Sequence, residues 1–416
     1  MSSSTSSSTS SANSSHYFCT MPAEWAPHAA CLLLYPHNPS TFRLELARAE
    51  VLQTARAIAG QGNEPVVLFC QTRAQADICL SQYQQQQRHL TESERACERI
   101  IVLVCPSNDT WARDTGPTFV VASNGDTDNG TFEKKLVGLD WDFNAYGGPQ
   151  EGCYWPCDLD QQVASRMCRA LSDDSSLNTA PIETLKIPLI LEGGSIHTDG
   201  EGTILTTKEC LGHTNRNPNM SQEEVQDFVL KATGCTKMIW LDTGLANDDD
   251  TNGHVDNFCV FVPQAAATVL LAWTDDAVND AENYQRCRAA LQVLESETNA
   301  KRQRLTVHKL HLPAPMAYSK QEAASLQPLA LADGTTVAPR QEGERMAASY
   351  VNFYIANEAV IVPQFGDVVA DARAIETLTP LFPGRTIVGV QSREILIGGG
   401  NIHCVTQQLP FIAHSS

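Results

Sequence analysis

Apolar and polar residues follow two different periods along this chain, one typical of helices and the other of strands. Apolar residues recur at helical spacing over residues 41–60, and we expect this helix to end at Gly60. The apolar side of this repeat consists of Leu44, Leu46, Ala47, Val51, Leu52, Ala55 and Ile58. Two short apolar runs, 64–70 and 100–105, are typical of strands, and a Gln-rich polar stretch ending near Arg88 separates them. This alternation predicts an α/β fold.

Three later segments are also predicted to be helical. Ser221 and Glu224 have the spacing of a capping box and predict a helix that reaches about Ala232. Residues 280–297 and 367–382 each carry apolar side chains at helical spacing. Short apolar runs that are typical of strands lie between these segments. The chain thus continues the α/β alternation to its C-terminal part.

Two kinds of internal repeat are present. Residues 193–197 and 399–403 share the pattern G-G-[S/N]-I-H about 200 residues apart. Residues 113–121, 253–262 and 352–357 each have a polar head followed by an apolar run. Recurrence of such a unit favours a pseudo-symmetric array over separate domains. In that array the polar heads converge on a central axis, where we expect the functional site.

Composition narrows the choice of ligand. Hydrophobic residues make up 42% of the 416 positions and charged residues 19%, which is typical of a soluble globular protein. No apolar run approaches the roughly 20 residues that span a bilayer. The formal net charge of −19 argues against nucleic acid and against an anionic membrane as partners, because both need clustered Lys and Arg. A small cation is a more natural ligand.

The cysteines and the N-terminal residues bear on compartment. Fourteen cysteines are scattered without a C-x-x-C pair, so no zinc-knuckle spacing is present. We expect free thiols in a reducing compartment. Residues 1–16 are mostly Ser and Thr and are interpreted as a disordered tail. A plastid transit peptide is the alternative, but the segment contains no Arg.

Four segments combine glycine with residues that can do chemistry: 111–117, 191–194, 250–257 and 398–404. Each one alone also fits a solvated turn before a core strand. In particular, Cys404 could be an inert buried thiol after a glycine turn. Four such segments in one chain favour an active site.

Strand geometry suggests which histidine would serve Cys404. Neighbouring side chains on a strand point to opposite faces, so His403 and Cys404 would not enter one pocket together. His254 and Asp256 are two residues apart and would share a face. We therefore expect His254 to be the base, and His403 to pack or hydrogen bond elsewhere.

A thiolate, a histidine and several carboxylates suit an electrophilic carbon inside a cation. Carboxylates match the planar fork of a guanidinium and would aim its central carbon at the sulfur. The bound cation would also lower the pKa of the thiol. Phosphate-binding loops, dinucleotide fingerprints and G-x-S-x-G elbows are absent from the sequence.

Eight collinear segments between about Tyr17 and Pro410 closely resemble the agmatine deiminases, which belong to the guanidine-modifying pentein superfamily. They are MPAEW, NDTWARDTGPTF, LDWDFNAYGG, LEGGSIHTDGEGT, NRNPNMS, DTNGHVDN, ASYVNFYIAN and GGGNIHCVTQQ. The resemblance implies a five-bladed α/β propeller of ββαβ units, formed by residues 17–416 as a single catalytic domain. It also implies a homodimer that hydrolyses agmatine to N-carbamoylputrescine and ammonia, a step of putrescine synthesis, without a metal or an organic cofactor. The start of the sequence contains no hydrophobic signal segment, so we expect the reducing compartment to be the cytoplasm.

The resemblance assigns roles by matching positions. It implies that Cys404 is the nucleophile and that Glu192 and His254 are acid/base groups. Asp114 and Asp256 would bind the guanidinium. We further expect Trp111 to wall the alkyl chain and Asp250 to meet the far ammonium, although residues 247–250 also fit an exposed acidic loop.

For other residues and segments we expect structural roles. Arg113 is expected to pair with structural acids, and residues 326–337 are expected to form a surface loop. Two rival functions belong to the same superfamily: a bacterial-type peptidylarginine deiminase and a non-catalytic binding module. The match at residues 250–257 argues against the first, and the presence of Cys404 argues against the second.

Overall fold

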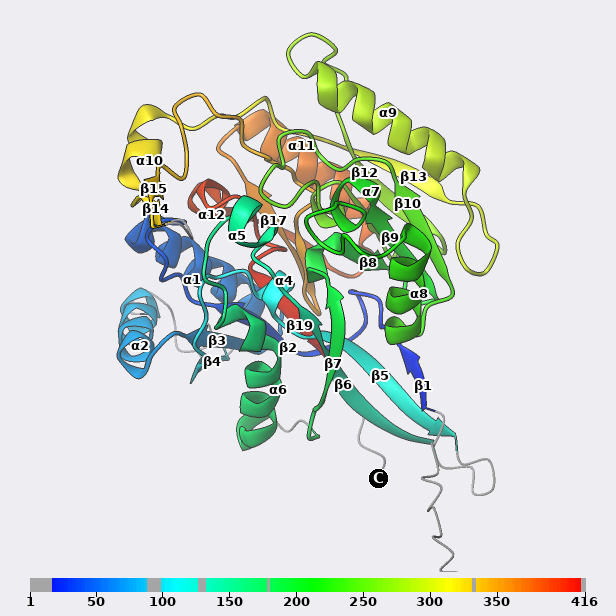
Figure 1. Ribbon diagram of the computed structural model, residues 1–416, viewed down its shortest axis with the longest axis horizontal. Helices are drawn as coiled ribbons and strands as arrows, with labels where there is room; N and C mark the ends of the chain where they lie inside the picture. The colour runs from blue at the N-terminus through cyan, green and yellow to red at the C-terminus, as the bar shows by residue number, and fades with distance from the viewer. Residues whose placement is uncertain (1–16, 88–98, 126–131, 178–179, 331–333, 413–416) are drawn as a thin grey trace, which may run out of the picture.

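The computed structural model describes residues 17–87, 99–125, 132–177, 180–330 and 334–412 (Figure 1). The tail predicted at residues 1–16 lies outside these ranges. Within them, strands and helices alternate as predicted, and the fold is a mixed α/β fold. No helix of the described part is long and apolar enough to cross a membrane.

The same arrangement of strands recurs in five sheets of the described chain. In each sheet a central strand pairs antiparallel with one neighbour and parallel with the strand that follows it along the chain, and a helix lies between the two parallel strands. The connection through a helix is what a parallel pair requires. A two-stranded hairpin, β14 (Leu329–Ala330) with β15 (Thr336–Val337), stands apart from these sheets.

The elements of the first three sheets run from residue 17 to residue 311. The first comprises β1 (Tyr17–Thr20), β5 (Thr118–Gly125), β6 (Phe132–Asp142), α6 (Val163–Asp173) and β7 (Glu183–Ile190). The second comprises β8 (Ile196–Thr198), β9 (Thr203–Thr207), α8 (Gln222–Thr233) and β10 (Lys237–Leu241). The third comprises β11 (Cys259–Phe261), β12 (Thr268–Trp273), α9 (Ala281–Ser296) and β13 (Thr306–His311).

The last two sheets contain the C-terminal strands, and the fifth also contains strands from the N-terminal part of the chain. The fourth comprises β16 (Tyr354–Ile355), β17 (Ala359–Gln364), α11 (Val368–Leu378) and β18 (Thr386–Gln391). The fifth comprises β19 (Thr406–Pro410), β2 (His28–Leu34), α1 (Leu44–Gly60), β3 (Val66–Cys70) and β4 (Ile100–Val104). In the fifth sheet the C-terminal strand β19 pairs with β2 from the opposite end of the chain.

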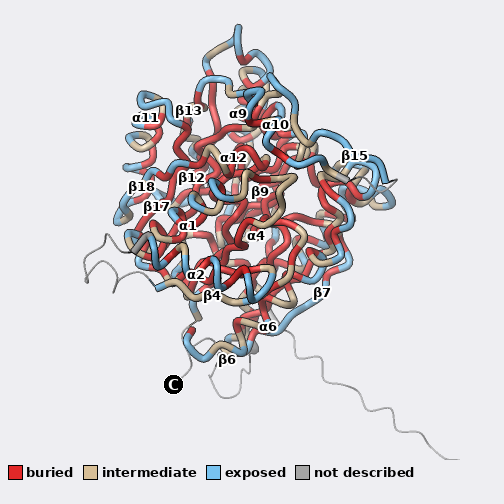
Figure 2. Tube along the Cα trace, turned by 90° about the vertical axis from the view of Figure 1, so that its left-hand side faces the viewer, coloured by how far each residue is buried: buried red, intermediate tan, exposed pale blue. Residues whose placement is uncertain are grey.

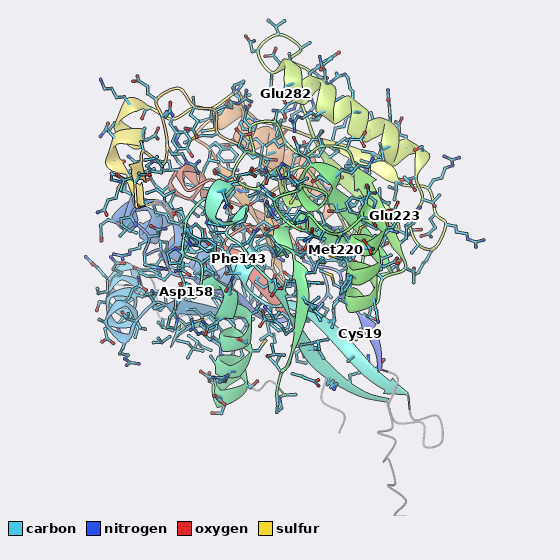
Figure 3. All side chains as sticks on the ribbon, viewed as in Figure 1. Cys19, Phe143, Asp158, Met220, Glu223 and Glu282 are labelled. Carbon is cyan, nitrogen blue, oxygen red and sulfur yellow. The ribbon has the colours of Figure 1, made fainter. Side chains whose placement is uncertain are left out.

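Helices cover the outside, and buried residues fill the interior. In Figure 1, α6, α8 and α9 lie at the periphery, while β19 lies near the centre. Figure 2 shows buried residues concentrated in the inner strands and loops. Acidic side chains such as Glu223 and Glu282 stand on the outer helices α8 and α9 (Figure 3).

The observed boundaries correct several predictions. The first long helix begins at Leu44 instead of residue 41 and includes Gly60, and Leu46 is exposed instead of buried. The Gln-rich stretch is a helix, α2 (Arg73–Gln87), because most of its polar residues face solvent while Ala76 and Cys79 are buried. The capping box at Ser221 is confirmed. The predicted helix at residues 367–382 ends at Leu378, where a 3₁₀ turn, Thr379–Leu381, follows.

Candidate active site

Cys404 lies in a turn that leads into β19, not on a regular strand. Its side chain is buried, with 6% exposed, and borders a pocket of about 260 Å³. Regular strand structure begins only at Thr406. The predicted alternation of His403 and Cys404 across a regular strand is therefore wrong, because both residues lie in the turn.

The glycines before Cys404 allow the turn to pack closely against its neighbours. Gly399 has a φ of 106°, which residues with a side chain rarely adopt. A Cβ atom on Gly400 would lie 2.6 Å from the ring of Trp111. Trp111 itself lines the pocket and packs against Phe42, with 5.4 Å between ring centroids.

Polar groups surround the sulfur of Cys404. The Nδ2 of Asn352 donates to it at 3.2 Å, and Oδ2 of Asp256 lies 3.8 Å away. Burial, followed by the negative charges of Asp256 and Asp114, raises the pKa of the Cys404 thiol well above its usual value. Without a cation in the site, this shift of the pKa favours the thiol over the thiolate.

His254 lies between two buried carboxylates. Its Nδ1 is 3.8 Å from Asp114 Oδ1, and its Nε2 is 3.7 Å from Glu192 Oε2. Burial opposes a charge on the ring, but neighbouring Cys210, Asp114 and Glu192 outweigh it and hold the pKa of His254 well above its usual value. His254 is thus positioned to carry a proton near Cys404's pocket.

Short turns, not strands, hold these groups. Asp114 lies on α4 (Ala112–Thr115), and Glu192 comes directly before the 3₁₀ turn η3 (Gly193–Ser195). His254 precedes and Asp256 lies within the 3₁₀ turn η4 (Val255–Asn257). The prediction that His254 and Asp256 share a strand face is therefore wrong, because the strand of this segment starts only at Cys259.

Gly194 leaves open the space on which these groups converge. A Cβ atom there would lie 2.7 Å from His254 Nδ1, 2.8 Å from Asp256 Oδ2 and 2.9 Å from Asp114 Oδ1. The backbone N–H of Gly194 also donates to Asp114 Oδ1 at 2.9 Å. Two carboxylates and an imidazole therefore face one small volume.

Asp114 has two donors besides its charged neighbours. The hydroxyl of Tyr146 donates to its Oδ2 at 2.8 Å, in addition to the Gly194 N–H. Burial is the main cause that raises the pKa of this carboxyl, and Asp256 adds to it, although His254 opposes the shift. A cation bound here would stabilise the carboxylate form.

Asp256 is held by His403. The Nδ1 of His403 lies 2.7 Å from Asp256 Oδ2, and its Nε2 lies 2.9 Å from both oxygens of Glu24. His403 does hydrogen bond, as predicted, but its partner is a carboxylate of the site itself. Arg113 donates to Glu24 at 3.2 Å, which confirms that it pairs with a buried acid.

Asp250 lies in the wall of the pocket, so it does not belong to an exposed acidic loop. Both of its oxygens accept from Arg340, at 2.8 and 2.5 Å. Arg340 follows the β14–β15 hairpin, and Leu329 and Val337 of that hairpin also line the pocket. The expectation that residues 326–337 are merely a surface loop is wrong for these two.

Sequence comparisons identify relatives over nearly the whole chain. The sequence model of the Porphyromonas-type peptidyl-arginine deiminase family matches residues 20–410. An agmatine deiminase from Medicago truncatula is 42% identical over 393 residues, which are 94% of this chain and 96% of the relative. One from Ectopseudomonas mendocina (strain ymp) is 42% identical over 392 residues, 94% of this chain and 95% of the relative.

The chain belongs to the agmatine deiminase family. A solved structure of the agmatine deiminase of Enterococcus faecalis agrees with the fold. It is 34% identical and superposes with a TM-score of 0.78, covering 94% of this chain and 96% of its own. The likeness therefore extends across all the segments that form the pocket of this agmatine deiminase family member.

The sequence did not predict three buried residues that contact the site, although all three lie in segments that resemble agmatine deiminases. Glu24 holds His403, and Asn352 contacts Cys404. Arg216 donates through Nε to Glu192 Oε1 at 2.7 Å. These residues act on other side chains of the site, and sequence spacing alone gives no signal for such contacts.

Proposed function

We propose that this chain hydrolyses agmatine to N-carbamoylputrescine and ammonia. The observation that carries the proposal is the single small volume at Gly194, which faces Asp114, Asp256 and His254 beside the pocket that Cys404 lines. The agmatine deiminases that match at 42% identity support the choice of substrate.

The carboxylates of Asp114 and Asp256 bind the guanidinium of agmatine. Paired charge-assisted hydrogen bonds match the planar cation and aim its central carbon at Cys404. The positive charge also offsets the two carboxylates that raise the pKa of the thiol. Substrate binding thereby produces the thiolate at the place where it is needed.

The reaction then proceeds in two steps. The Cys404 thiolate attacks the guanidinium carbon, His254 gives its proton to the departing ammonia, and an S-alkylthiouronium remains. His254 next takes a proton from water, which attacks the same carbon. The C–S bond breaks, Cys404 leaves as the thiolate, and N-carbamoylputrescine is released. Glu192 supports the imidazolium in both steps, because it lies 3.7 Å from Nε2.

Selectivity for agmatine resides at the other end of the pocket. Trp111 walls the alkyl chain, and Asp250 meets the terminal ammonium. To bind Asp250, the ammonium must either share this carboxylate with Arg340 or displace Arg340 from it. The Asp250–Arg340 ion pair thus determines how far the ammonium can reach along the pocket.

The proposal also includes the blade architecture, the domain organisation, the oligomeric state and the pathway that the resemblance implies. The five recurring sheets act as five blades of ββαβ units around a pseudo-five-fold axis, and residues 17–416 form one domain. The protein works as a cytoplasmic homodimer in putrescine synthesis. The described cysteines are free, which fits a reducing compartment. Light scattering at the mass of two chains would support the dimer.

The rival function is deimination of arginine in peptides, because the matching family model carries that description. The test offers agmatine, free arginine and a peptidyl arginine side by side and measures ammonia. We expect turnover of agmatine, with Cys404→Ala as the inactive control. No turnover of agmatine would refute the proposal, and turnover of the peptide alone would establish the rival.

A further inference from the structure

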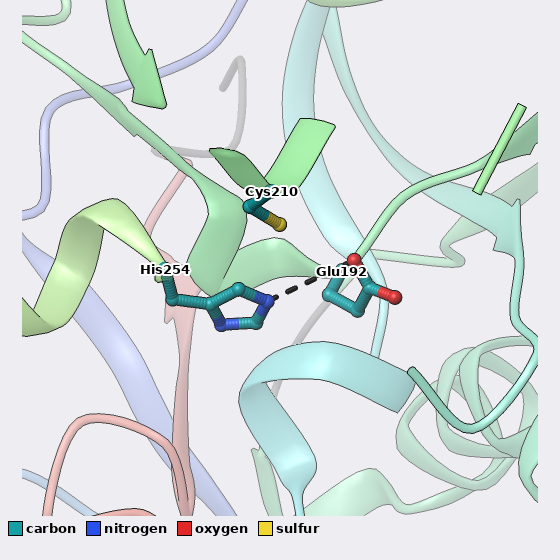
Figure 4. Close-up of side chains that lie close together, drawn as sticks. All are labelled: Glu192, Cys210 and His254. Atoms are coloured by element: carbon teal, nitrogen blue, oxygen red, sulfur yellow. Dashed lines mark ion pairs between the residues drawn. The ribbon is translucent and has the colours of Figure 1, made fainter. Parts of the chain in front are cut away.

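A third potential ligand lies beside the two proposed acid/base groups. Cys210, on α7 (Lys208–Leu211), is fully buried, and its sulfur points toward the gap between His254 and Glu192 (Figure 4). One ligand atom from each of these three residues lies within 4.8 Å of the other two. The residues are far apart in sequence, so cysteine spacing could not predict the cluster.

Three buried atoms of this cluster lack a hydrogen-bond partner within the described ranges. They are Oε2 of Glu192 and both ring nitrogens of His254; Glu192 Oε2 and His254 Nε2 lie 3.7 Å apart, beyond hydrogen-bond distance. Buried polar atoms are nearly always paired, and an unpaired one calls for an explanation such as an ion. The other oxygen of Glu192 accepts from Arg216, so Oε2 is the one that remains for a ligand.

We propose that Glu192, Cys210 and His254 form an inhibitory binding site for Zn²⁺. Thiolate, imidazole and carboxylate are the three ligand types that zinc takes in proteins, whereas Mg²⁺ and Ca²⁺ prefer oxygen alone. Three protein ligands leave a fourth tetrahedral position for water. Binding exchanges the thiol proton of Cys210 and any proton on His254 Nε2 for the ion.

The surroundings fit this ion. Asp114 lies 3.8 Å from the other ring nitrogen of His254 and can accept its N–H, as carboxylates often do behind a histidine that binds zinc. Asp114 also lines the pocket, so one side chain connects the pocket wall with His254 of the cluster. Within the site, Asp114, Asp256 and Glu192 supply negative charge that favours a cation.

A bound ion would stop turnover because it occupies the atoms that move protons in the proposed reaction. This consequence rests on the proposed function, whereas the binding itself does not. Binding is therefore measured separately, with Co²⁺ as a coloured substitute for Zn²⁺. Coordination by a cysteine sulfur gives Co²⁺ an intense near-ultraviolet absorption.

The binding experiment compares wild type with Cys210→Ala, Cys210→Ser, Cys404→Ala and the remote control Cys287→Ala. We expect wild type, Cys404→Ala and Cys287→Ala to show the sulfur-to-cobalt absorption at one equivalent, and Zn²⁺ to abolish it. Both Cys210 variants should lose it and bind Zn²⁺ about 100-fold more weakly or worse. Loss in Cys404→Ala with retention in Cys210→Ala, or no absorption in wild type, would overturn the site.

The second experiment measures agmatine turnover with added Zn²⁺. Inhibition that a chelator reverses is expected in wild type and in Cys287→Ala, and about 100-fold more Zn²⁺ should be needed in Cys210→Ala. Equal inhibition of Cys210→Ala would contradict the proposal. An enzyme that turns over no agmatine even without Zn²⁺ would refute the proposed function, and the cobalt measurement would still decide the site.

Discussion

One imidazole nitrogen of His403 lies 2.7 Å from Oδ2 of Asp256, the same oxygen that lies 3.8 Å from the Cys404 sulfur. The other nitrogen of His403 contacts Glu24, so the ring links two buried carboxylates. Burial opposes a charge on this ring, and Arg113 does too, but Glu24 and Asp256 raise the pKa of His403 above its usual value. His403 is therefore a positioning residue for Asp256.

His403→Gln should lower kcat/KM for agmatine. Leaving a buried partner unsatisfied costs about 1–3 kcal/mol, which corresponds to about 10-fold to 100-fold in rate. His197→Gln is the matched control, because His197 also lies near Glu24, at 3.5 Å, and should have the smaller effect. If His403→Gln has wild-type activity, His403 does not position Asp256 for the reaction.

Cys404→Ser should abolish turnover, because a serine hydroxyl with no lowered pKa is a weak nucleophile. Rapid quenching of the wild type with agmatine followed by intact-protein mass spectrometry should reveal the covalent adduct, and the variant should show none. Cys287→Ala, a buried cysteine on the outer helix α9, is the control and should behave as wild type. Substantial turnover by Cys404→Ser would exclude Cys404 as the nucleophile.

Gly194→Ala should remove activity while the protein remains folded. The added methyl group would enter the volume that faces His254, Asp256 and Asp114 at less than 3 Å. We expect agmatine turnover to fall by at least about 1000-fold, as when transition-state contacts are lost. Gly366→Ala is the control: Gly366 has a φ of 89° and open space around it, so the change should lower the melting temperature alone. An active Gly194→Ala enzyme would contradict the guanidinium site.

The pH dependence of alkylation tests the thiol state of Cys404. Its raised pKa means that, at a given pH, less thiolate is present than for an ordinary cysteine. The rate of Cys404 modification by iodoacetamide, followed by peptide mass spectrometry without substrate, should therefore still be rising at pH 9.

Asp256→Asn provides the comparison for that measurement. The substitution removes a negative charge that raises the pKa of Cys404, so alkylation at a fixed pH should become faster although turnover is lost. A rate that reaches its plateau near pH 7 in wild type would show that the free enzyme already holds a thiolate.

Paired substitutions test the role of Asp250. If the ammonium of agmatine binds Asp250, Asp250→Asn should raise KM by about 10-fold, the effect of losing about 1.4 kcal/mol, with little change in kcat. Arg340→Gln should lower KM, because it frees the carboxylate from its competitor. Equal increases of KM in both variants would mean that the ion pair serves only to hold the pocket wall.

The sequence predicted those features that depend on local pattern or on a shared motif. The capping box at Ser221 predicted a helix start, and the repeated polar heads before strands predicted the convergence that His254, Asp256 and Asp114 show around Gly194. The strand-face predictions were wrong because short turns replace regular strand at Asp256 and at Cys404. Periodicity does not resolve elements of three or four residues.

Contacts between distant segments could not be predicted. Glu24 and His403 are 379 positions apart, and Arg340 reaches Asp250 across 90 positions. No rule of sequence spacing predicts either contact, because the packing of whole sheets brings these residues together. The Glu192, Cys210 and His254 cluster is of the same kind, since its members come from three segments that are far apart in the sequence.

The pairing of β19 with β2 also has a consequence for biosynthesis. β19 follows Cys404 almost immediately, so the turn that carries this thiol is anchored only after β19 has added to the edge of β2. A ribosome-bound chain would carry β2 with an uncovered edge until residues 406–410 emerge. The pocket that Cys404 lines is thus completed only after residues 406–410 have been synthesised, and shorter chains should lack it.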